Sequence, residues 1–337
     1  MNKNILITGA AGFIGFHLIK KICKENFNVY GLDNLNDYYD VSLKQDRLKI
    51  LEQNDNFEFL KIDLADYQTL NNYFQKIQPD VVINLAAQAG VRYSIENPHA
   101  YGKSNLEGFL NILECCRNFE VEHLIYASSS SVYGANKKIP FSESDSVDHP
   151  VSLYAATKKS NELLAHSYSD LYKIPTTGLR FFTVYGPFGR PDMAYYSFTK
   201  KIFNDEAIDV YNFGKMERDF TFIDDIVESI IRLIPKIPTD NNNWNFMNPN
   251  PQNSFAPYVI YNIGNNKPVQ LEYFIEVLEN NIGKKAIKNY LPMQKGDVLK
   301  TYANINNLVK LIEYEPKTSI EEGLKIFVNW YKKYYLM

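Results

Sequence analysis

Short apolar runs alternate with longer amphipathic segments through the first half of the chain. The runs with the length and composition of β-strands are 5–7, 28–32, 57–62, 81–85, 123–127 and 176–182. Between them, apolar residues recur at helical spacing in 14–25, 70–77, 106–117 and 155–171. Strand and helix in regular alternation predict a parallel sheet with helices on both faces. Burial on both faces also explains why these strands are apolar throughout.

The alternation ends near residue 183. Proline and asparagine become frequent there, and the Asn-rich segment 235–257 is typical of a long surface loop. Beyond it, 258–263 has the pattern of another buried strand, and helical patterns follow at 271–282, 307–312 and 320–331. The sequence therefore predicts an α/β fold, a Rossmann-type doubly wound parallel sheet followed by a smaller C-terminal α/β lobe.

Composition and charge narrow the classes of function. Apolar residues make up 45% of the 337 residues and the net charge is −3, which favours a large core and gives no basic surface for nucleic acid. No apolar run approaches the roughly 18 residues of a membrane span, and no signal-peptide pattern is present. The three cysteines and five histidines show no metal-binding spacing. We expect a cytoplasmic protein with reduced thiols and no metal site.

A glycine-rich stretch directly follows the first expected strand. Gly9, Gly12 and Gly15 stand between that strand and the first helical pattern, as in a loop that binds a dinucleotide. Glycine lets the backbone approach a pyrophosphate, and the free N–H groups at a helix start favour an anion. The second strand ends at Asp33, where a carboxylate accepts a hydrogen bond from the adenosine ribose and repels a 2′-phosphate. We therefore expect NAD rather than NADP.

A tyrosine and a lysine one helical turn apart can place an ammonium beside a phenol. This spacing occurs at Tyr133/Lys137, Tyr154/Lys158, Tyr196/Lys200 and Tyr211/Lys215. Of these pairs, Tyr154 and Lys158 open a long helical pattern, with Ser152 available as its cap, and follow a strand that ends in the serines 128–131. Ligands of open parallel sheets bind beyond the carboxyl ends of the strands, so we expect this pair in the active site.

With these motifs, the chain resembles an extended short-chain dehydrogenase/reductase, and specifically the nucleotide-sugar 4-epimerases. The resemblance covers nearly the whole length and rests on 9–15, 84–87, 128–134, 179–182 and 218–220 beside the Tyr154/Lys158 pair. Segments 32–40, 88–94, 183–187 and 190–193 are similar to UDP-glucuronate 4-epimerases in particular.

The resemblance implies roles for individual residues. The implied catalytic residues are Ser129, Tyr154 and Lys158. The implied NAD contacts are Gly9, Gly12, Phe13, Ile14, Gly15, Asp33, Asn34, Asp63, Leu64, Leu85, Ala86, Ala87, Asn105, Tyr154, Lys158 and Phe182. The implied substrate contacts are Arg92, Ser129, Ser130, Thr183, Arg190, Arg218 and Asp297.

The residues at two positions, both serine here, indicate which of the reactions catalysed by related proteins is expected. Related sugar 4,6-dehydratases carry an Asp-Glu pair before a Val-Tyr-Gly sequence, and UDP-glucuronate decarboxylases carry a Glu directly before it. Here Ser130 and Ser131 stand before Val132, and hydroxyls are poor substitutes for the acid and base that water elimination needs. The sequence therefore favours 4-epimerisation, in which NAD stays bound and Tyr154 takes the proton of the sugar 4-hydroxyl.

A uronic acid substrate adds the requirement that the 4-keto intermediate must not lose CO2. Ser130 and Thr183 are the expected neutral donors to its carboxylate, and a simple hexose epimerase tends to carry Asn at the second place. Arg190 and Arg218 are expected to pair with the diphosphate, and the alternative for each is a surface ion pair. Two positions depart from the family pattern. Phe188 replaces a polar group, and Lys103 replaces an acid or amide.

The resemblance also implies a domain division and an assembly. Residues 1–183 are expected to form the NAD-binding domain, with 219–262 returning to it, while 184–218 and 263–337 form the nucleotide-sugar-binding lobe. The apolar faces of the helical patterns 106–117 and 155–171 imply a homodimer through a four-helix bundle.

The predicted function is NAD-dependent conversion of UDP-glucuronate to UDP-galacturonate for polysaccharide biosynthesis. The alternatives are a UDP-glucose or UDP-N-acetylglucosamine 4-epimerase, and an NAD-binding protein without turnover.

Overall fold

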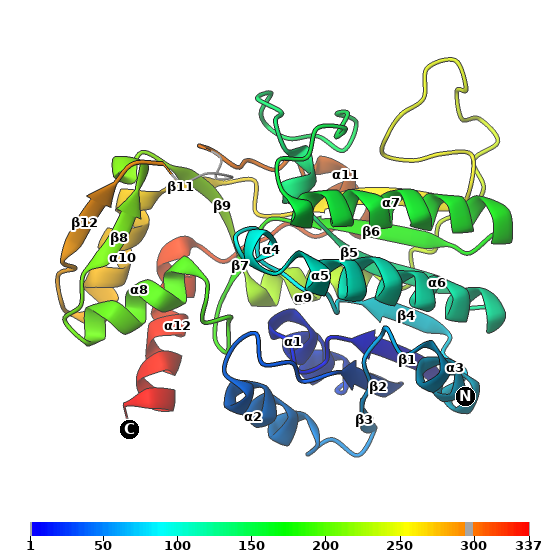
Figure 1. The fold of residues 1–337 in the computed structure, drawn as a ribbon, viewed down its shortest axis with the longest axis horizontal. Helices are drawn as coiled ribbons and strands as arrows, with labels where there is room; N and C mark the ends of the chain where they lie inside the picture. The colour runs from blue at the N-terminus through cyan, green and yellow to red at the C-terminus, as the bar shows by residue number, and fades with distance from the viewer. Residues whose placement is uncertain (1, 294–298, 337) are drawn as a thin grey trace.

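A seven-stranded parallel sheet forms the centre of the computed structural model, which describes residues 2–293 and 299–336 (Figure 1). Its strands are β1 (Lys3–Thr8), β2 (Phe27–Asp33), β3 (Phe57–Lys61), β4 (Val81–Asn84), β5 (His123–Ser129), β6 (Thr176–Phe181) and β10 (Tyr258–Ile263). The spatial order is β10-β6-β5-β4-β1-β2-β3, and every neighbouring pair is parallel. The order changes direction between β1 and β4, the place where ligands bind in such sheets. The predicted doubly wound sheet is confirmed.

Alternate side chains of the central strands enter two different cores. Ile5 and Ile7 of β1 pack on the side of α1 (Phe13–Ile22), α2 (Val41–Leu51) and α9 (Ile223–Leu233). Leu6 between them packs on the side of α3 (Tyr67–Ile77), α6 (Gly108–Asn118) and α7 (Leu153–Tyr172). Each fully buried side chain of this kind contributes about 1.5–3 kcal/mol by leaving water. The two-sided burial accounts for strands that are apolar at every position.

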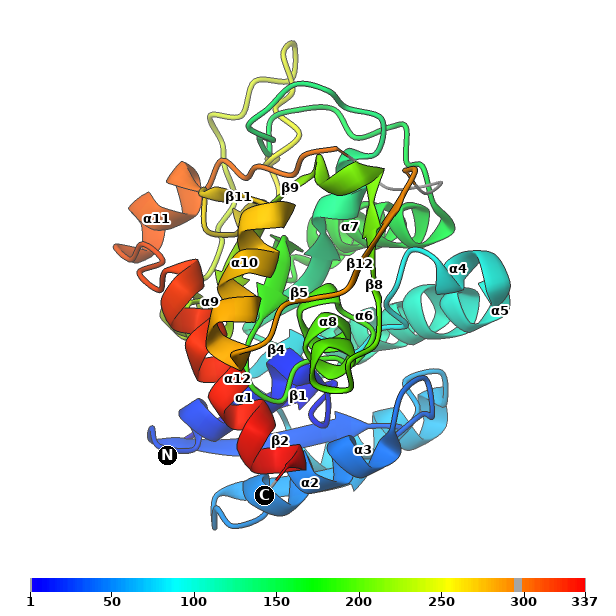
Figure 2. The same ribbon diagram turned by 90° about the vertical axis from the view of Figure 1, so that its left-hand side faces the viewer.

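Two smaller sheets and several helices lie to one side of the central sheet (Figures 1 and 2). One sheet has the order β11-β9-β7, and the other pairs β12 with β8. The strands are β7 (Thr183–Tyr185), β8 (Ile208–Tyr211), β9 (Glu217–Phe222), β11 (Pro268–Gln270) and β12 (Lys288–Leu291). The helices of this part are α8 (Ala194–Phe203), α10 (Leu271–Ile282) and α12 (Ile320–Tyr335), while α11 (Asn306–Ile312) packs beside β10 and α9 (Figure 1). This group is the smaller α/β part that the sequence predicts.

Short helical turns complete the chain between β4 and α7. They are α4 (Tyr93–Glu96), α5 (Pro98–Tyr101), the π-helix Gly102–Glu107 that leads into α6, and the 3-10 turn Ser130–Tyr133 that follows β5. Another 3-10 turn, Asn212–Gly214, follows β8.

The Asn-rich segment after α9 forms the predicted surface loop, drawn in yellow at the upper right of Figure 1. Trp244, Phe246 and Phe255 gather at its base, with ring centroids 5.0–5.7 Å apart. The loop thus has a small aromatic cluster of its own.

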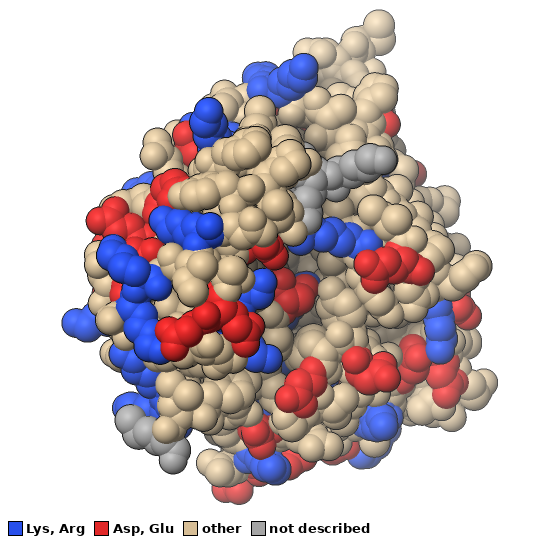
Figure 3. All heavy atoms as spheres, turned by 60° about the vertical axis from the view of Figure 1, so that its left-hand side comes forward, with Lys and Arg blue, Asp and Glu red and all other residues tan. Residues whose placement is uncertain are grey.

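On the face shown in Figure 3, charge is spread without a large patch of one sign. Lys and Arg alternate with Asp and Glu around a hollow in the face shown in Figure 3. Within residues 2–293 and 299–336, no group of three His, Cys, Asp or Glu side chains could hold a metal ion. No helix in the same part of the chain is both long and apolar enough to cross a membrane. Cys23, Cys115 and Cys116 are free thiols.

Candidate active site

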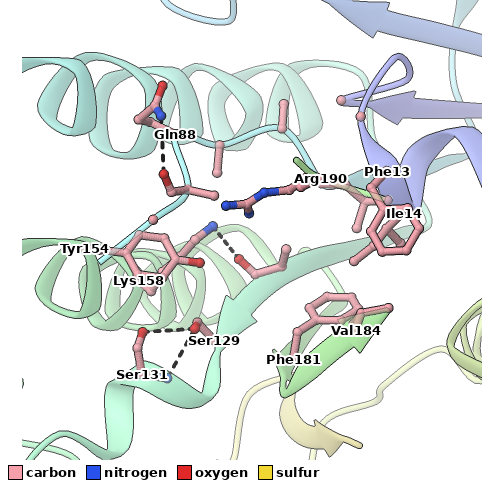
Figure 4. Close-up of a pocket in the computed structure, with 18 of the residues that line it drawn as sticks. Phe13, Ile14, Gln88, Ser129, Ser131, Tyr154, Lys158, Phe181, Val184 and Arg190 are labelled. Atoms are coloured by element: carbon pink, nitrogen blue, oxygen red, sulfur yellow. Dashed lines mark hydrogen bonds between the residues drawn. The ribbon is translucent and has the colours of Figure 1, made fainter. Parts of the chain in front are cut away.

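A deep pocket opens at the carboxyl ends of the central strands, and most of the predicted site residues line it. Loops after β1, β2, β3, β4, β5 and β6 form its wall, and β7 and α7 close it (Figure 4). The predicted residues along this wall are Gly9, Gly12, Phe13, Ile14, Gly15, Asp33, Asn34, Asp63, Leu64, Leu85, Ala86, Ala87, Ser129, Ser130, Tyr154, Lys158, Phe182, Thr183, Arg190 and Arg218.

Three predicted residues are not part of this wall. Asn105 is buried, and its amide bonds to the backbone of Gln88 and to the Thr157 hydroxyl instead of facing the cavity. Arg92 is exposed at the start of α4, where its guanidinium lies over the ring of Tyr211. Asp297 lies outside the described residues.

The glycine loop presents backbone to the pocket where a side chain would not fit. Gly9 has φ +72°, and a Cβ there would lie 2.9 Å from the Ala86 nitrogen. A Cβ on Gly15 would lie 2.1 Å from the Gly9 oxygen. Helix α1 begins after Gly12 without a side-chain cap, so the N–H groups of its first turn are free to bind an anion. This cradle fits the pyrophosphate of a dinucleotide.

The carboxylate of Asp33 is held at the rim next to this loop. Its oxygens accept hydrogen bonds from the Ala11 nitrogen at 3.2 Å and the Leu35 nitrogen at 2.8 Å. The position at the end of β2, beside the pocket, is the one expected for an acid that binds a ribose hydroxyl.

Asp63 lies further along the rim and forms an ion pair with Lys103 at 2.9 Å. Burial raises the pKa of Asp63, but Lys103 and the Ala65 N–H outweigh it and keep this pKa below its usual value. Lys103, which departs from the family pattern, is therefore paired with Asp63, and the ion pair also fixes the Asp63 carboxylate.

Ser129, Tyr154 and Lys158 come together in the wall of the pocket (Figure 4). Ser129 ends β5, and the other two lie one turn apart near the start of α7, which Ser152 caps through the Ala155 N–H. The ammonium of Lys158 is buried and donates to the Ala127 carbonyl at 2.8 Å. Burial lowers the pKa of Lys158 to about 8.

The phenol of Tyr154 is subject to opposing effects. Burial raises its pKa, while a hydrogen bond with Ser129 and the charge of Arg190 lower it. Burial is the largest of the three, so the pKa of Tyr154 lies above its ordinary value. Forming a phenolate here therefore requires further positive charge close by.

The other tyrosine–lysine pairs do not reproduce this setting. The hydroxyl of Tyr133 is buried and donates to Asn262 at 2.7 Å, and its ring stacks on Phe141. Tyr196 lies on α8 within an aromatic cluster and bonds to Tyr335. Tyr211 ends β8 and no α-helix follows it.

A buried ion pair fixes α7 against the central strands. Arg180 of β6 donates to both carboxylate oxygens of Glu162, at 2.8 and 2.9 Å, and Ser128 donates to the same carboxylate at 2.6 Å. Burial raises the pKa of Glu162, but Arg180 overrides it and the carboxyl stays ionised. Glu162 lies one turn after Lys158 on α7, so this network sets the distance from α7 to the end of β5.

The residues expected to face the sugar have short side chains that carry a hydroxyl group. Ser130 and Thr183 line the pocket from the ends of β5 and β6. The next hydroxyl, Ser131, donates to the Ser129 oxygen at 2.9 Å, and its N–H donates to the same atom at 3.2 Å. No carboxylate occupies either position between β5 and Val132.

Two arginines, Arg190 and Arg218, also line the pocket. Arg190 points toward Tyr154 and Lys158 in Figure 4 and forms a two-pronged ion pair with Asp192, with N–O distances of 3.0 and 2.5 Å. The same carboxylate accepts from the Tyr38 hydroxyl at 3.2 Å. Arg218 of β9 donates to the Leu299 carbonyl at 3.3 Å.

The sequence did not single out several residues of this wall. Tyr38, Lys44 and Gln88 all line the pocket, and the Lys44 ammonium is bonded to Asn36 at 2.7 and 2.8 Å. Tyr38 and Gln88 lie in segments on which the family resemblance rests, but neither belongs to a motif with its own mechanism. Their loops give no periodic pattern that would indicate which side chains face inward.

Known proteins resemble this chain in sequence and in fold. The sequence profile of the NAD dependent epimerase/dehydratase family matches residues 5–271. The chain is 61% identical to "Protein CapI" of Staphylococcus aureus, covering 98% of this chain and 99% of that one. It is 50% identical to "Probable UDP-glucuronate 4-epimerase" of Rhizobium meliloti, covering 98% and 97%.

Among solved structures, the fold is similar to UDP-glucuronic acid 4-epimerase from Bacillus cereus in complex with UDP-glucuronic acid and NAD. The TM-score is 0.86 at 32% identity, and the match covers 98% of this chain and all of that chain. The similarity therefore extends across both the central sheet and the smaller α/β part.

Proposed function

Because the chain belongs to the NAD-dependent epimerase/dehydratase family, we propose that it interconverts UDP-glucuronate and UDP-galacturonate by 4-epimerisation. The observation that carries the proposal is the pocket that joins the glycine loop to Ser129, Tyr154 and Lys158, with serines in place of carboxylates after β5. The set has a base for the sugar hydroxyl and lacks the acid pair expected of a dehydratase.

The residues that we propose to hold NAD follow the wall of the pocket from the glycine loop to the floor. Gly9, Gly12 and Gly15 with the start of α1 would hold the pyrophosphate, and Asp33 the adenosine ribose. When bound, NAD supplies the hydride acceptor, and then the donor, at C4 of the sugar. The other proposed contacts are Phe13, Ile14, Asn34, Asp63, Leu64, Leu85, Ala86, Ala87, Tyr154, Lys158 and Phe182.

The protein's own part in the reaction is to move one proton and hold one oxygen. As a phenolate, Tyr154 takes the proton of the 4-hydroxyl, and it returns this proton when the 4-keto sugar has presented its other face. Lys158 stabilises the phenolate by its charge, and Ser129 holds the same sugar oxygen by a hydrogen bond. The buried pair of Arg180 and Glu162 keeps the three groups at fixed separation.

The carboxylate of the substrate sets a second requirement. A 4-keto uronic acid loses CO2 when its C5–C6 bond lines up with the carbonyl π system. Ser130 and Thr183, which line the pocket, would donate to the carboxylate and hold it out of that alignment. Thr183 also favours the acid over a neutral hexose, and Arg190 with Arg218 would bind the diphosphate.

Incubation of the purified protein with UDP-glucuronate tests this function. We expect a product of unchanged mass, identified as UDP-galacturonate by NMR, without NADH accumulation and without UDP-pentose. Entry of solvent deuterium at C5 would instead indicate 5-epimerisation. Parallel incubations with UDP-glucose and UDP-N-acetylglucosamine should give slower turnover, and faster turnover would favour the neutral-sugar alternative.

We propose the predicted domain division for this function. Residues 1–183 with 219–262 would bind NAD, and 184–218 with 263–337 would bind the UDP-sugar. Support comes from β10, which joins the central sheet, and from α9, which shares the core of α1. Limited proteolysis with and without UDP would show whether the second pair of segments is protected as a unit.

We further propose that the protein works as a homodimer in the cytoplasm, supplying UDP-galacturonate for polysaccharide biosynthesis. The support for a dimer is an exposed apolar face on α6 and α7. Leu163 and Leu171 are 59% and 65% exposed there, and Leu110 is 39% exposed. Two copies of this helix pair would form the four-helix bundle. The three free thiols are compatible with a reducing compartment.

A further inference from the structure

Three consecutive backbone carbonyls directly before Arg190 are held by side chains of α1 and α2. The Pro187 oxygen lies 2.8 Å from His17 Nε2 of α1. The Phe188 and Gly189 oxygens accept hydrogen bonds from one Nη of Arg47 of α2, at 2.6 and 3.3 Å. These contacts hold the segment directly before Arg190, whose side chain lines the pocket.

The other end of the Arg47 guanidinium reaches the glycine loop. Its second Nη donates to the Ala11 carbonyl at 2.7 Å and to the Tyr39 hydroxyl at 2.6 Å. Arg47 is completely buried, and its hydrogen-bond partners within residues 2–293 and 299–336 are all neutral. Burying a guanidinium without a counter-ion costs free energy. A residue that served only to fill space here would therefore be apolar and not an arginine.

The segment 187–189, whose carbonyls His17 and Arg47 hold, is strained and tightly packed. Phe188 has φ +53°, a conformation that bulky residues rarely adopt. Its ring contacts Phe16, Trp330 and Tyr334 at centroid distances of 5.0, 4.9 and 5.6 Å. The last two lie on α12, which passes close to α2 in Figure 2. The expected polar group is thus replaced by an aromatic anchor.

We propose that Arg47 is a positioning residue that places Arg190 against the diphosphate of the UDP-sugar. One guanidinium fixes both the carbonyls that precede Arg190 and the Ala11 carbonyl of the glycine loop, so the two ligand-binding loops keep one relative position. This inference rests on the proposed UDP-sugar site. It implies that Arg47 affects nucleotide affinity through Arg190 and not through a contact of its own.

A double-mutant cycle tests this coupling, with UDP binding to the purified, NAD-loaded protein measured by calorimetry. The variants are Arg47→Lys, Arg190→Gln and their combination, because lysine keeps the charge but lacks the fork that serves several carbonyls at once. Arg47→Lys should raise the UDP dissociation constant about tenfold alone and by less than about twofold beside Arg190→Gln. Equal factors in both backgrounds, or no effect of either single change, would overturn the proposal.

A second variant and a matched control separate positioning from loss of stability. His17→Phe removes the bond to Pro187 and should show the same dependence on Arg190, even where Arg47→Lys fails to fold. His123→Gln changes another buried histidine, whose partners are Ile234 and Thr177, away from the pocket. It should lower Tm and leave UDP affinity unchanged. Equal weakening of UDP binding by His123→Gln would mean general loosening and would refute the inference.

The binding experiment and the turnover experiment test different proposals, and either can give a negative result without the other. A protein that binds UDP with the expected coupling but leaves UDP-glucuronate unchanged keeps this inference and loses the proposed reaction. A protein that epimerises UDP-glucuronate while Arg47 and Arg190 contribute additively keeps the reaction and loses the inference.

Discussion

Burial opposes charge on both members of the tyrosine–lysine pair. It raises the pKa of Tyr154 and lowers the pKa of Lys158 to about 8, so below that pH the ammonium is still mostly protonated. The proposed reaction needs the phenolate, and the positive charges of Lys158, Arg190 and the oxidised nicotinamide would together offset the effect of burial. We therefore expect Tyr154 to be a phenolate only while the cofactor is in its oxidised form.

Replacing Tyr154 by phenylalanine isolates this role. The ring that packs at 6.1 Å from Tyr101 remains, while the proton acceptor is lost. We expect turnover of UDP-glucuronate to fall by about 10²–10⁴-fold, the usual share of general acid–base catalysis, with NAD content unchanged. NMR of the sugar products and absorbance of the released cofactor measure the two quantities.

Tyr196→Phe is the matched control for this prediction. Tyr196 has the same spacing to a lysine, but its hydroxyl bonds to Tyr335 outside the pocket wall. Its variant should keep normal turnover. Near-normal turnover of Tyr154→Phe would show that another group moves the proton.

At the level of single residues, the sequence predicted which positions end a strand and reach the pocket, but not the direction of every side chain. Ser129 ends the buried strand β5 and Thr183 begins β7 just after β6, so their place at the sheet edge follows from the pattern. Asn105 was expected at the cofactor, yet its amide turns to Gln88 and Thr157 because buried backbone there needs a partner. A shift of one residue in the start of a helix changes the direction in which such a side chain points, and the sequence pattern does not locate the start that closely.

At the level of elements, the missed helix α2 shows why pattern analysis fails beside a binding site. Two of its inward positions are Lys44 and Arg47, which are 4% and 0% exposed, so the apolar period of a surface helix is interrupted. The short strands β7, β8, β9, β11 and β12 were missed for another reason. They lie beyond the regular strand–helix alternation of the first half, and they pair with partners distant in sequence.

One buried histidine joins three elements and makes their packing sensitive to acid. His123 begins β5 and bonds to the Ile234 carbonyl after α9 at 3.0 Å and to the Thr177 hydroxyl of β6 at 2.8 Å. Burial lowers its pKa from 6.5 to about 4, although the bond to Ile234 opposes the change. Between these two values the unfolded chain binds the proton and the folded chain does not.

The free energy of unfolding should therefore fall as the pH drops from 6.5 to 4. One group with this shift contributes at most about 3 kcal/mol to the change. Urea unfolding of the wild type and of His123→Gln at several pH values measures it. We expect the two curves to converge at low pH, and curves that stay parallel would show that His123 does not titrate in this window.

At the level of the whole molecule, local patterns predicted a parallel sheet but not its edges. Regular strand–helix alternation determines that neighbouring strands run parallel, as they do from β1 to β6. The addition of β10 beside β6 depends on tertiary packing across the long Asn-rich loop. The Phe188 contacts with α12 are equally non-local, since more than a third of the chain separates them.

The exposed face of α6 and α7 gives a prediction about assembly. In a two-fold symmetric bundle each substitution occurs twice and near the symmetry axis, so Leu163→Glu would place two carboxylates in an apolar interface. We expect the wild type to be a dimer and Leu163→Glu a monomer, measured by size-exclusion chromatography with light scattering. The control is Ile287→Glu, which changes a residue 57% exposed, against 59% for Leu163, in the smaller α/β part. A dimeric Leu163→Glu protein would place the contact on another surface, because burial of unpaired charges at this position costs more than the leucine contact contributes.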